Sequence, residues 1–455
     1  MNELLDLLAC PRCDKALDEI DAGHRCSGCK IDFPALAGIP WLFSEPNFAR
    51  AEWRQRLDFL LRRLEYDSQQ IDRALTQRDD LLALTRQRLA SRKAALTDQS
   101  ERLRALLEPL EINTSSASYE MYLALRTQLP PDQGLTTYYP NLHRDWCWGD
   151  EENDAALELL APGLEDLDVK SKVLVLGSGA GRLAYDIHNA HSPSITVALD
   201  FNPLLQLVLE RVAKGETVEL FEFPLAPRTL DDHAILRKHG APAATRPGLH
   251  AVLGDALRAP FKNGSFDIVV TPWLVDILPD DFATLCRRIN CLLANKGRWL
   301  NFGSLQFGHT SYDRQYSPEE CAALVEAAGF TTPDTEEATI PYLSSPSSRH
   351  ARQETVLAWQ AVKNRKIKQP DRYEALPDWL VKGADPVPVL EAFRVQAATT
   401  RIHAGLMALV DGKRSLKDMA KILVNQRVMT PADAEPAVRK FLTKMYHDSQ
   451  RGQRL

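Results

Sequence analysis

KVLVLGSGAGRLAYDIH, residues 172–188, is the stretch that decides the fold. Its first part is a short apolar run with the composition of a buried strand. Gly177, Gly179 and Gly181 follow at once, and apolar residues then recur at helical spacing. Glycines let a turn from strand to helix close tightly and let a ligand approach the backbone. The stretch therefore predicts the first strand, turn and helix of an α/β domain with a ligand site at the turn.

Further short apolar runs after residue 188 indicate the other strands of a parallel sheet. They are TVALDF, HAVLGDAL, FDIVVTPWLVDIL and GRWLNFGSL, and segments between them such as DDFATLCRRINCLLA have helical periodicity. Residues 214–249, rich in proline, alanine and histidine, indicate an insertion between strands. The alternation of strands and helices predicts one α/β domain over residues 135–365.

The acidic residue that follows the second strand narrows the ligand class. Asp200 lies 23 residues after Gly177, where a carboxylate can bind both hydroxyls of a ribose. A dinucleotide-binding domain would share these features. The spacing GxGxG, in place of GxGxxG, favours a methionine moiety over the loop, because no pyrophosphate then has to bind at the helix N-terminus. We therefore expect a Rossmann-like class I methyltransferase domain that binds S-adenosylmethionine.

A second acidic residue, Asp255 in the GDA sequence, ends the strand that we count as the fourth. Class I methyltransferases place an acidic side chain here for the adenine amino group, and the alternative is a carboxylate that only stabilises a turn. The residues that we expect to bind the cofactor on these grounds are Gly177, Ser178, Gly179, Gly181, Asp200, Asn202, Asp255, Ala256 and Thr271.

Composition and charge limit the other classes of function. The 455 residues are 44% hydrophobic and 25% charged, as in ordinary globular proteins, and the length suggests about three folding units. The formal charge of -6, from 55 basic and 61 acidic side chains, gives no general argument for nucleic-acid binding. No apolar stretch approaches the ~20 residues of a membrane span, and the N-terminus has no secretory signal pattern. We expect a cytoplasmic protein without a membrane partner.

Four of the eight cysteines form two CxxC pairs near the N-terminus. Cys10 and Cys13 are separated from Cys26 and Cys29 by twelve residues, a spacing typical of four thiolates around one zinc ion. Four thiolates leave no open coordination position, so a structural Zn²⁺ is favoured over a redox or catalytic role. Residues 1–43 resemble the small zinc-binding activator subunit of eukaryotic and archaeal RNA and protein methyltransferases. The resemblance implies a zinc ribbon that adds a strand to a methyltransferase partner, here within the same chain.

Helical segments flank the α/β domain. Residues 48–110 contain no glycine, and no proline before Pro109, and their apolar residues recur at helical spacing. Their alternating charges favour a solvated helical hairpin or coiled coil over an RNA-binding arm. Near the C-terminus, Ser415 and Thr430 are helix start signals, and the segment loosely resembles a PqqD-like winged helix. The predicted organisation is a zinc ribbon (1–45), a helical hairpin with a linker (46–134), the methyltransferase domain (135–365), a linker (366–384) and a helical or winged-helix module (385–455).

Several segments between Tyr138 and Lys363 resemble the carnosine N-methyltransferase family. NLHRDWCWG resembles the family's RDW segment, in which an amide residue and an arginine contact the cofactor, and Asn141 and Arg144 hold these positions. GSGAGRLA resembles the family's glycine loop and includes Arg182 after the last glycine. The resemblance covers about half of the chain and implies that these three side chains contact the cofactor.

The substrate side of the resemblance is less complete. TPWLVDIL resembles the family's T-x-F-F-I-D-T-A and places Asp276 at the substrate-binding carboxylate, with Trp273 and Leu274 in place of an aromatic pair. GRWLNFGSLQFGHT resembles the family's G-G-x-W-I-N-x-G-P-L-x-Y-H, with one extra residue before His309, and IPYLSSPSS places Tyr342 at a pocket position. Asp276, His309 and Tyr342 are therefore the candidate catalytic residues. Each has a structural alternative: a helix cap, a loop residue and a packing residue, respectively.

Together these expectations describe an N-methyltransferase acting on the imidazole of a histidine-containing small molecule, peptide or protein. Two alternatives remain. The first keeps the methyltransferase but makes RNA or another protein residue the acceptor, with the zinc ribbon as an activator in cis. The second is a protein that binds the cofactor without catalysis and works through its terminal modules. Nucleic acid is thus a possible partner that the charge balance does not favour.

Overall fold

The computed structural model describes residues 3–112, 135–308, 312–374, 377, 379–380 and 384–452. The chain forms two compact units, Met1–Glu374 and Ala375–Leu455, and the division falls within residues 366–384, where the sequence indicates a linker. None of the described helices has both the length and the apolar content that crossing a bilayer requires.

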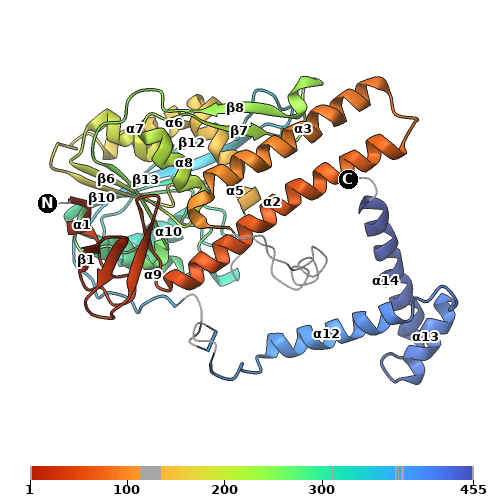
Figure 1. Ribbon diagram of the computed structural model, residues 1–455. Coiled ribbons are helices and arrows are strands. Elements are labelled where there is room, and N and C mark those ends of the chain that lie inside the picture. The colour runs from red at the N-terminus through yellow and green to blue at the C-terminus, as the bar shows by residue number, and fades with distance from the viewer. Residues whose placement is uncertain are drawn as a thin grey trace. The chain divides into compact units, whose positions relative to one another are not determined.

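The first unit is built around a sheet of eleven strands (Figure 1). The strands are β1 (Leu17–Ile20), β2 (Gly23–Cys26), β3 (Asp32–Leu36), β4 (Ile39–Leu42), β5 (Lys172–Leu176), β6 (Ile195–Asp200), β9 (Leu249–Gly254), β10 (Phe266–Pro272), β11 (Leu293–Gly303), β12 (Asp334–Tyr342) and β13 (Arg352–Val362). Their order across the sheet is β1-β2-β3-β4-β9-β6-β5-β10-β11-β13-β12. Every neighbouring pair from β4 to β11 is parallel, and the pairs at both ends are antiparallel. This is the mostly parallel sheet of the predicted class I methyltransferase fold.

The predicted insertion at residues 214–249 has strands of its own. They are β7 (Val218–Glu222) and β8 (Ile235–His239), which pair with each other in an antiparallel hairpin outside the main sheet. Because this hairpin does not join the sheet, β9 is the third parallel strand counted from β5, so our count of four strands before Asp255 is wrong.

Helices cover both faces of the sheet. In the described part of the first unit they are α1 (Glu3–Leu7), α2 (Pro46–Gln77), α3 (Ala83–Leu106), α5 (Leu135–His143), α6 (Asp150–Leu160), α7 (Arg182–His191), α8 (Pro203–Ala213), α9 (Phe282–Leu292) and α10 (Pro318–Ala327), with short turns that include η2 (Arg144–Trp148) and η5 (Ala256–Arg258). Val173 and Val175 of β5 belong to a core with residues of α2, α3 and α5 to α8. Leu174 and Leu176 belong to the core that includes α1, α9 and α10. A strand buried on both faces therefore requires the unbroken apolar run seen in the sequence.

The N-terminal cysteine-bearing segment extends this sheet. Its last strand, β4, pairs in parallel with β9, and Trp41 lies opposite Leu253. The backbone N–H of Ala9 donates to the carbonyl of Pro260 (2.8 Å), and Leu8 is fully buried in the core shared with the sheet. The strand addition that the resemblance to an activator subunit implies therefore takes place within one chain.

α2 and α3 form a helical hairpin, as the periodicity of residues 48–110 predicts (Figure 1). Trp53 and Leu57 of α2 and Leu103 of α3 are buried where the hairpin contacts the core. Many of its cations are paired with carboxylates of the hairpin itself. The pairs include Arg56–Glu52, Arg62–Asp58, Arg63–Asp67, Lys93–Asp72, Arg102–Asp98 and Arg104–Glu65. This pairing favours the solvated hairpin over an RNA-binding arm.

The second unit is helical in its described part. Its helices are α12 (Glu391–Ala408), α13 (Leu416–Asn425) and α14 (Pro431–Gly452). They enclose a small core that includes Leu406 and Val438. Ser415 caps α13, and α14 begins directly after Thr430, at the two start signals in the sequence. The described residues of this unit form no strand, so they support the helical form of the predicted module and not the winged form.

Candidate functional site

The glycine loop between β5 and α7 has the shape that its three glycines permit. The backbone N–H groups of Gly177 and Ser178 both donate to the carbonyl of Leu199 in β6 (2.9 and 3.0 Å), which folds the loop over that strand. All three glycines have positive φ angles, and a Cβ at Gly177 would lie 2.7 Å from the side chain of Leu274. A Cβ at Gly179 would meet no atom within 4 Å. Gly177 therefore serves packing, whereas Gly179 leaves room for a ligand against the backbone.

Asp200, the last residue of β6, connects this loop to the second strand. Its side chain is buried, and its two oxygens accept hydrogen bonds from the backbone N–H groups of Gly179 (2.9 Å) and Asn202 (2.8 Å). Burial raises the pKa of Asp200 to about 6. A carboxylate offers roughly four acceptor positions, so these two bonds leave capacity for two ligand hydroxyls. This acceptor capacity is what the two hydroxyls of the predicted ribose would require.

Asp255 follows β9, which lies beside β6 in the sheet. Its carboxylate accepts a hydrogen bond from the backbone N–H of Leu257 (2.8 Å) and so caps η5, which begins at Ala256. Burial raises the pKa of Asp255. One oxygen thus has the turn-stabilising role that we gave as the alternative, and the residue still lies at the same sheet edge as Asp200.

The first segment of the domain carries Tyr138, Asn141 and Arg144, and Tyr138 lies near Asp200 and Phe201. Tyr138, Asn141 and Arg144 follow one another at intervals of three residues along α5 and η2, which places them on one side of the helix. Burial raises the pKa of Tyr138, and the charges of Asp200 and Tyr342 add to this effect. η2 is a π-helical turn, a form that often occurs at functional sites.

Arg144 is held rigidly by two buried carboxylates. Its Nε donates to Asp145 (2.7 Å) and its Nη1 donates to Glu152 (3.1 Å). The other oxygen of Glu152 accepts from the backbone N–H of Leu343 (2.8 Å), the residue after β12. Arg144 also interacts electrostatically with Tyr342. The arginine therefore joins the predicted cofactor side of the site to the predicted substrate side.

Asp276 lies in the loop that follows β10, at the carboxyl ends of the parallel strands. It is buried, and its Oδ2 accepts a hydrogen bond from the backbone N–H of Gln306 (2.6 Å) in the loop after β11. It does not cap α9, because Asp281 does so. The helix-cap alternative for Asp276 is therefore wrong. Trp273, earlier in the same loop, has a positive φ of 50°, a strained conformation that is common at functional sites.

Tyr342 ends β12 and forms an aromatic contact with Trp273, with ring centroids 4.7 Å apart. The guanidinium of Arg352 lies over the ring of Tyr342, 4.2 Å from its centre. Burial raises the pKa of Tyr342. The packing alternative for Tyr342 thus holds in part, although the ring lies beside Arg144 and Tyr138. His309, the remaining candidate, lies outside the described residues.

Four predicted cofactor residues have side chains engaged with the protein. Arg182 pairs with Asp186 and Asp150 and donates to the carbonyl of Asp145. Thr271 is fully buried, and its hydroxyl accepts a hydrogen bond from the indole of Trp299 (2.9 Å). Ser178 accepts from Gln206 (3.1 Å), and Asn202 caps α8. These four side chains are held by partners within the protein, and their contact with the cofactor stays a prediction.

Sequence reasoning missed residues that the structure brings to the site. Tyr138 contacts the ring of Phe201, with centroids 6.1 Å apart, and Phe201 directly follows Asp200. Glu152 holds Arg144, and Leu274 packs on Gly177. The spacing of three between Tyr138 and Asn141 could have identified the tyrosine. The roles of Glu152 and Leu274 depend on contacts between distant segments.

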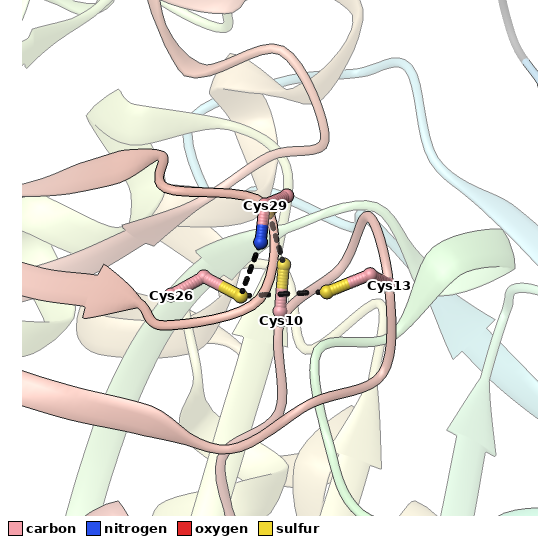
Figure 2. A group of neighbouring side chains, drawn as sticks. All are labelled: Cys10, Cys13, Cys26 and Cys29. Atoms are coloured by element: carbon pink, nitrogen blue, oxygen red, sulfur yellow. Dashed lines mark hydrogen bonds between the residues drawn. The ribbon is translucent and has the colours of Figure 1, made fainter.

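The four N-terminal cysteines converge on one point, as Figure 2 shows. Their sulfur atoms all lie within 4.8 Å of one another, with Cys10 and Cys29 3.5 Å apart and Cys13 and Cys26 3.4 Å apart. These separations are far longer than the ~2.05 Å of a disulfide. They approach the ~3.8 Å between sulfurs around a tetrahedral zinc ion with Zn–S bonds of about 2.3 Å. The donor set therefore fits Zn²⁺.

The two CxxC turns have matching backbones. Asp14 and Lys30, which follow the second cysteine of each pair, have φ angles of 62° and 58°. Their N–H groups donate to the carbonyls of Cys10 and Cys26, both at 2.9 Å. The backbone N–H groups of Arg12 and Cys29 also donate to the sulfurs of Cys10 and Cys26. Such hydrogen bonds orient the side chains that bind a metal.

Solved structures that resemble part of the chain include several methyltransferases. One is a complex of the Haloferax volcanii Trm112 methyltransferase activator with a methyltransferase, at 15% identity over 48% of this chain and 96% of that one, with a TM-score of 0.32. Another is phosphoethanolamine N-methyltransferase 2 of Haemonchus contortus with S-adenosylhomocysteine, at 15% identity over 50% of this chain and 57% of that one, with a TM-score of 0.33. No curated protein sequence matches the chain.

A family comparison is more specific than these structural likenesses. The sequence profile of the carnosine N-methyltransferase family matches residues 135–365, about half of the chain. The matched range runs from α5 to β13 and includes the glycine loop, Asp200, Asp276 and Tyr342. The chain therefore belongs to the carnosine N-methyltransferase family and is an S-adenosylmethionine-dependent methyltransferase.

Proposed function

We propose that the chain methylates an imidazole nitrogen in a histidine-containing small molecule, peptide or protein. The observation that carries this proposal is the buried carboxylate of Asp276 at the carboxyl end of β10. The adjoining Leu274 packs directly on Gly177, so the loop that holds Asp276 lies against the glycine loop. Ligands of α/β sheets bind at this edge. A carboxylate at this place suits an acceptor that must be oriented by a hydrogen bond.

For methyl transfer the protein has to align the acceptor lone pair with the methyl carbon and to exclude water. S-adenosylmethionine supplies a methyl group on a sulfonium, which an unprotonated nitrogen lone pair can accept. An imidazole with a pKa near ~6.5 is largely neutral at cellular pH and has one such nitrogen. Asp276 would accept a hydrogen bond from the other ring nitrogen, fix the tautomer and stabilise the positive charge that develops. Trp273 and Tyr342 would enclose the acceptor.

The acceptor class can be tested with the purified full chain and a methyl-labelled donor. We expect label to enter histidine-containing dipeptides or longer peptides, and to be absent from matched peptides in which alanine replaces histidine. Amino-acid analysis of the product should recover methylhistidine. Label that enters the alanine peptides equally, or enters only RNA, would contradict the proposal.

A second candidate function keeps the methyltransferase and makes RNA or another protein residue its acceptor. The observation that favours it is the addition of β4 to β9, which places the cysteine-bearing segment where the resemblance to an activator subunit implies. If RNA is the acceptor, its affinity should fall steeply with salt, because phosphate contacts release counterions. The labelling experiment includes RNA for this reason.

We also propose that the four N-terminal thiolates bind a structural Zn²⁺. Support comes from the convergence of the sulfurs and from the matching turns around them. Four thiolates would complete a tetrahedral site without an open position. The metal would then stabilise the strand that extends the sheet, away from the chemistry.

Replacing Gly179 by alanine should weaken cofactor binding without unfolding the protein. The added Cβ meets no protein atom within 4 Å, but it enters the space in which a ligand would approach the loop. We expect the dissociation constant for S-adenosylhomocysteine to rise at least about tenfold, measured by calorimetry. Gly215→Ala is the matched control, because Gly215 also has a positive φ and open space around its Cβ. Both variants should lose about 1 kcal/mol of stability, and equal affinities would refute the role of Gly179.

Cofactor binding should depend on pH through Asp200. Burial raises the pKa of this carboxyl to about 6, and only the ionised form can accept hydrogen bonds from both ribose hydroxyls. Protonation removes an acceptor, so affinity should be constant above pH ~7 and fall by up to about tenfold per unit below pH ~6. Calorimetric titrations with S-adenosylhomocysteine between pH 5 and 8 measure this.

The variant Asp200→Asn separates this effect from other titrating groups. It should bind the ligand more weakly at pH 8 and should lose the pH dependence. Asp255→Asn should keep the dependence, because Asp200 is intact in that variant. A pH profile that survives in Asp200→Asn would show that another group titrates.

A further inference from the structure

We propose that His143, Cys147 and His239 bind a second metal ion, Zn²⁺, at a site separate from the four cysteines. One ligand atom from each of the three side chains lies within 4.8 Å of the others. Nδ1 of His143 and Nε2 of His239 are 2.9 Å apart. Two imidazoles and one thiol thus converge in a space that one ion can fill.

The three ligands come from two elements that the fold brings together. His143 is the last residue of α5, and Cys147 lies four residues later in η2, so both are on the same side of the helix. His239 is the last residue of β8 in the inserted hairpin, 96 residues away from His143. Both histidines are buried, with 2% and 0% of their surface exposed. The convergence of two buried imidazoles and one partly buried thiol is the first argument for a metal.

The hydrogen bond of His239 supplies the second argument. Nδ1 of this ring lies 2.8 Å from the backbone carbonyl of Val218, which can only accept, so Nδ1 carries the proton. Nε2 is then an unprotonated nitrogen with its lone pair directed at the cluster. Histidines that bind metals in proteins are typically oriented by such a bond from the other ring nitrogen to a backbone carbonyl.

The metal-free arrangement leaves a polar atom without a partner. If His143 donates from Nδ1 to His239, its Nε2 has no proton and no hydrogen-bond partner, although the side chain is buried. In the other tautomer Nε2 carries the proton and faces the carbonyl of Phe221, but the unprotonated Nδ1 then lies 2.9 Å from the unprotonated Nε2 of His239 and has no donor. A buried polar atom without a hydrogen-bond partner destabilises the fold. A simple pair of core histidines is therefore an incomplete explanation of the geometry.

The charges around the cluster are balanced without the ion. The charge of Arg237, on β8, acts on both histidines, and its Nε pairs with Glu222 at 2.7 Å. Coordination would replace the proton of the Cys147 thiol, which leaves to solvent, so a divalent ion adds one net positive charge. The Sγ of Cys147 now contacts the carbonyl of Lys238 (3.3 Å), a contact that the thiolate would give up for the metal.

The ligand types identify the metal class. Two neutral imidazoles and one thiolate suit Zn²⁺, which takes nitrogen and sulfur together in tetrahedral sites. Such a site has a fourth position for a solvent molecule. The ion would connect the inserted hairpin to the helical turn that carries Arg144, one residue from His143. It would therefore stabilise the segment that faces the proposed cofactor site.

Zinc content and X-ray absorption of the purified full chain test this proposal directly. We expect about two zinc ions per chain, one for each cluster. The averaged zinc coordination should combine sulfur at about 2.3 Å with nitrogen or oxygen at about 2.0–2.1 Å. If the chain binds one zinc ion and sulfur atoms are the only ligands that the absorption spectrum shows, the proposal of a second site is refuted. The proposed methyltransferase function is unaffected by that result.

Variants assign the second ion to its ligands. Cys147→Ser should lower the zinc content by one ion and should increase the share of sulfur in the remaining coordination shell. The matched control is Cys291→Ser, because Cys291 is also partly buried and lies outside both clusters. It should keep both ions. A Cys147→Ser variant that keeps both ions would refute the assignment, and if that variant does not fold, the absorption spectrum of the unmodified chain decides.

Discussion

Replacement of Cys26 by serine is expected to lower the free energy of unfolding of the first unit by about 4 kcal/mol or more. Loss of a structural metal is among the few single changes with effects of this size. Cys26 is fully buried, and its segment contributes to the core that includes β5, β6 and β9. The loss should therefore reach the methyltransferase sheet itself. Calorimetry of the full chain should show the main melting transition at least about 8 °C lower.

The control for this prediction is Cys291→Ser, which removes a thiol outside the clusters. The melting temperature of this variant should shift by less than about 2 °C, because substitutions of partly exposed residues change stability little. A chelator should lower the transition of the unmodified chain by more than it lowers that of Cys26→Ser, because the variant would retain only the proposed second ion. If the Cys26→Ser variant melts at the same temperature as the unmodified chain, no structural metal is bound at the four cysteines.

The second large effect is expected from Asp276→Asn. Asparagine has nearly the same shape, and its oxygen can still accept the hydrogen bond that Gln306 donates to Asp276 (2.6 Å). The loop should therefore keep its conformation while the negative charge is lost. Removal of one group that stabilises charge in a transition state typically costs a factor of about 10²–10³ in turnover. We expect such a loss in kcat, with the dissociation constant of S-adenosylhomocysteine unchanged, because the proposed role of Asp276 is toward the acceptor.

Asp280→Asn is a matched control in the same loop. Asp280 pairs with Arg288 at 3.2 Å and lies four residues beyond Asp276, in the direction of α9. Its neutralisation should leave kcat within about twofold of the original, since exposed or partly exposed ion pairs contribute little. Turnover by Asp276→Asn at the original rate would remove this residue from the mechanism. Equal losses in both variants would point to a general effect of loop charge.

The sheet and the glycine loop could be predicted because their signals are local. The run from Val173 to Leu176 is apolar at every position, which a strand buried on both faces requires. Gly177, Gly179 and Gly181 then supply positive φ angles at a turn that other residues adopt only with strain. The two CxxC pairs are equally local, because each turn presents both of its sulfurs to the same side.

Side-chain partners across the fold could not be predicted in the same way. Arg182 follows the last glycine, which suggests a ligand contact, yet its guanidinium pairs with Asp186 and Asp150. Thr271 lies near the end of a strand at the site edge, but its hydroxyl points to Trp299 in the core. The strand's alternation decides which way a side chain points, and the register between strands fixes its partners. Neither the register between strands nor the packing of helices can be predicted from a short stretch of residues.

The amino-acid sequence by itself determined the strand, the glycine turn, the acidic end of β6 and the paired cysteines. Each depends on residues a few positions apart, whose backbone preferences and side-chain chemistry act locally. Only the tertiary structure decided that β4 joins the sheet, that Glu152 holds Arg144, and that His239 meets His143 across 96 residues. These contacts arise when burial of apolar faces brings distant segments together, and which segments meet depends on the packing of the complete chain.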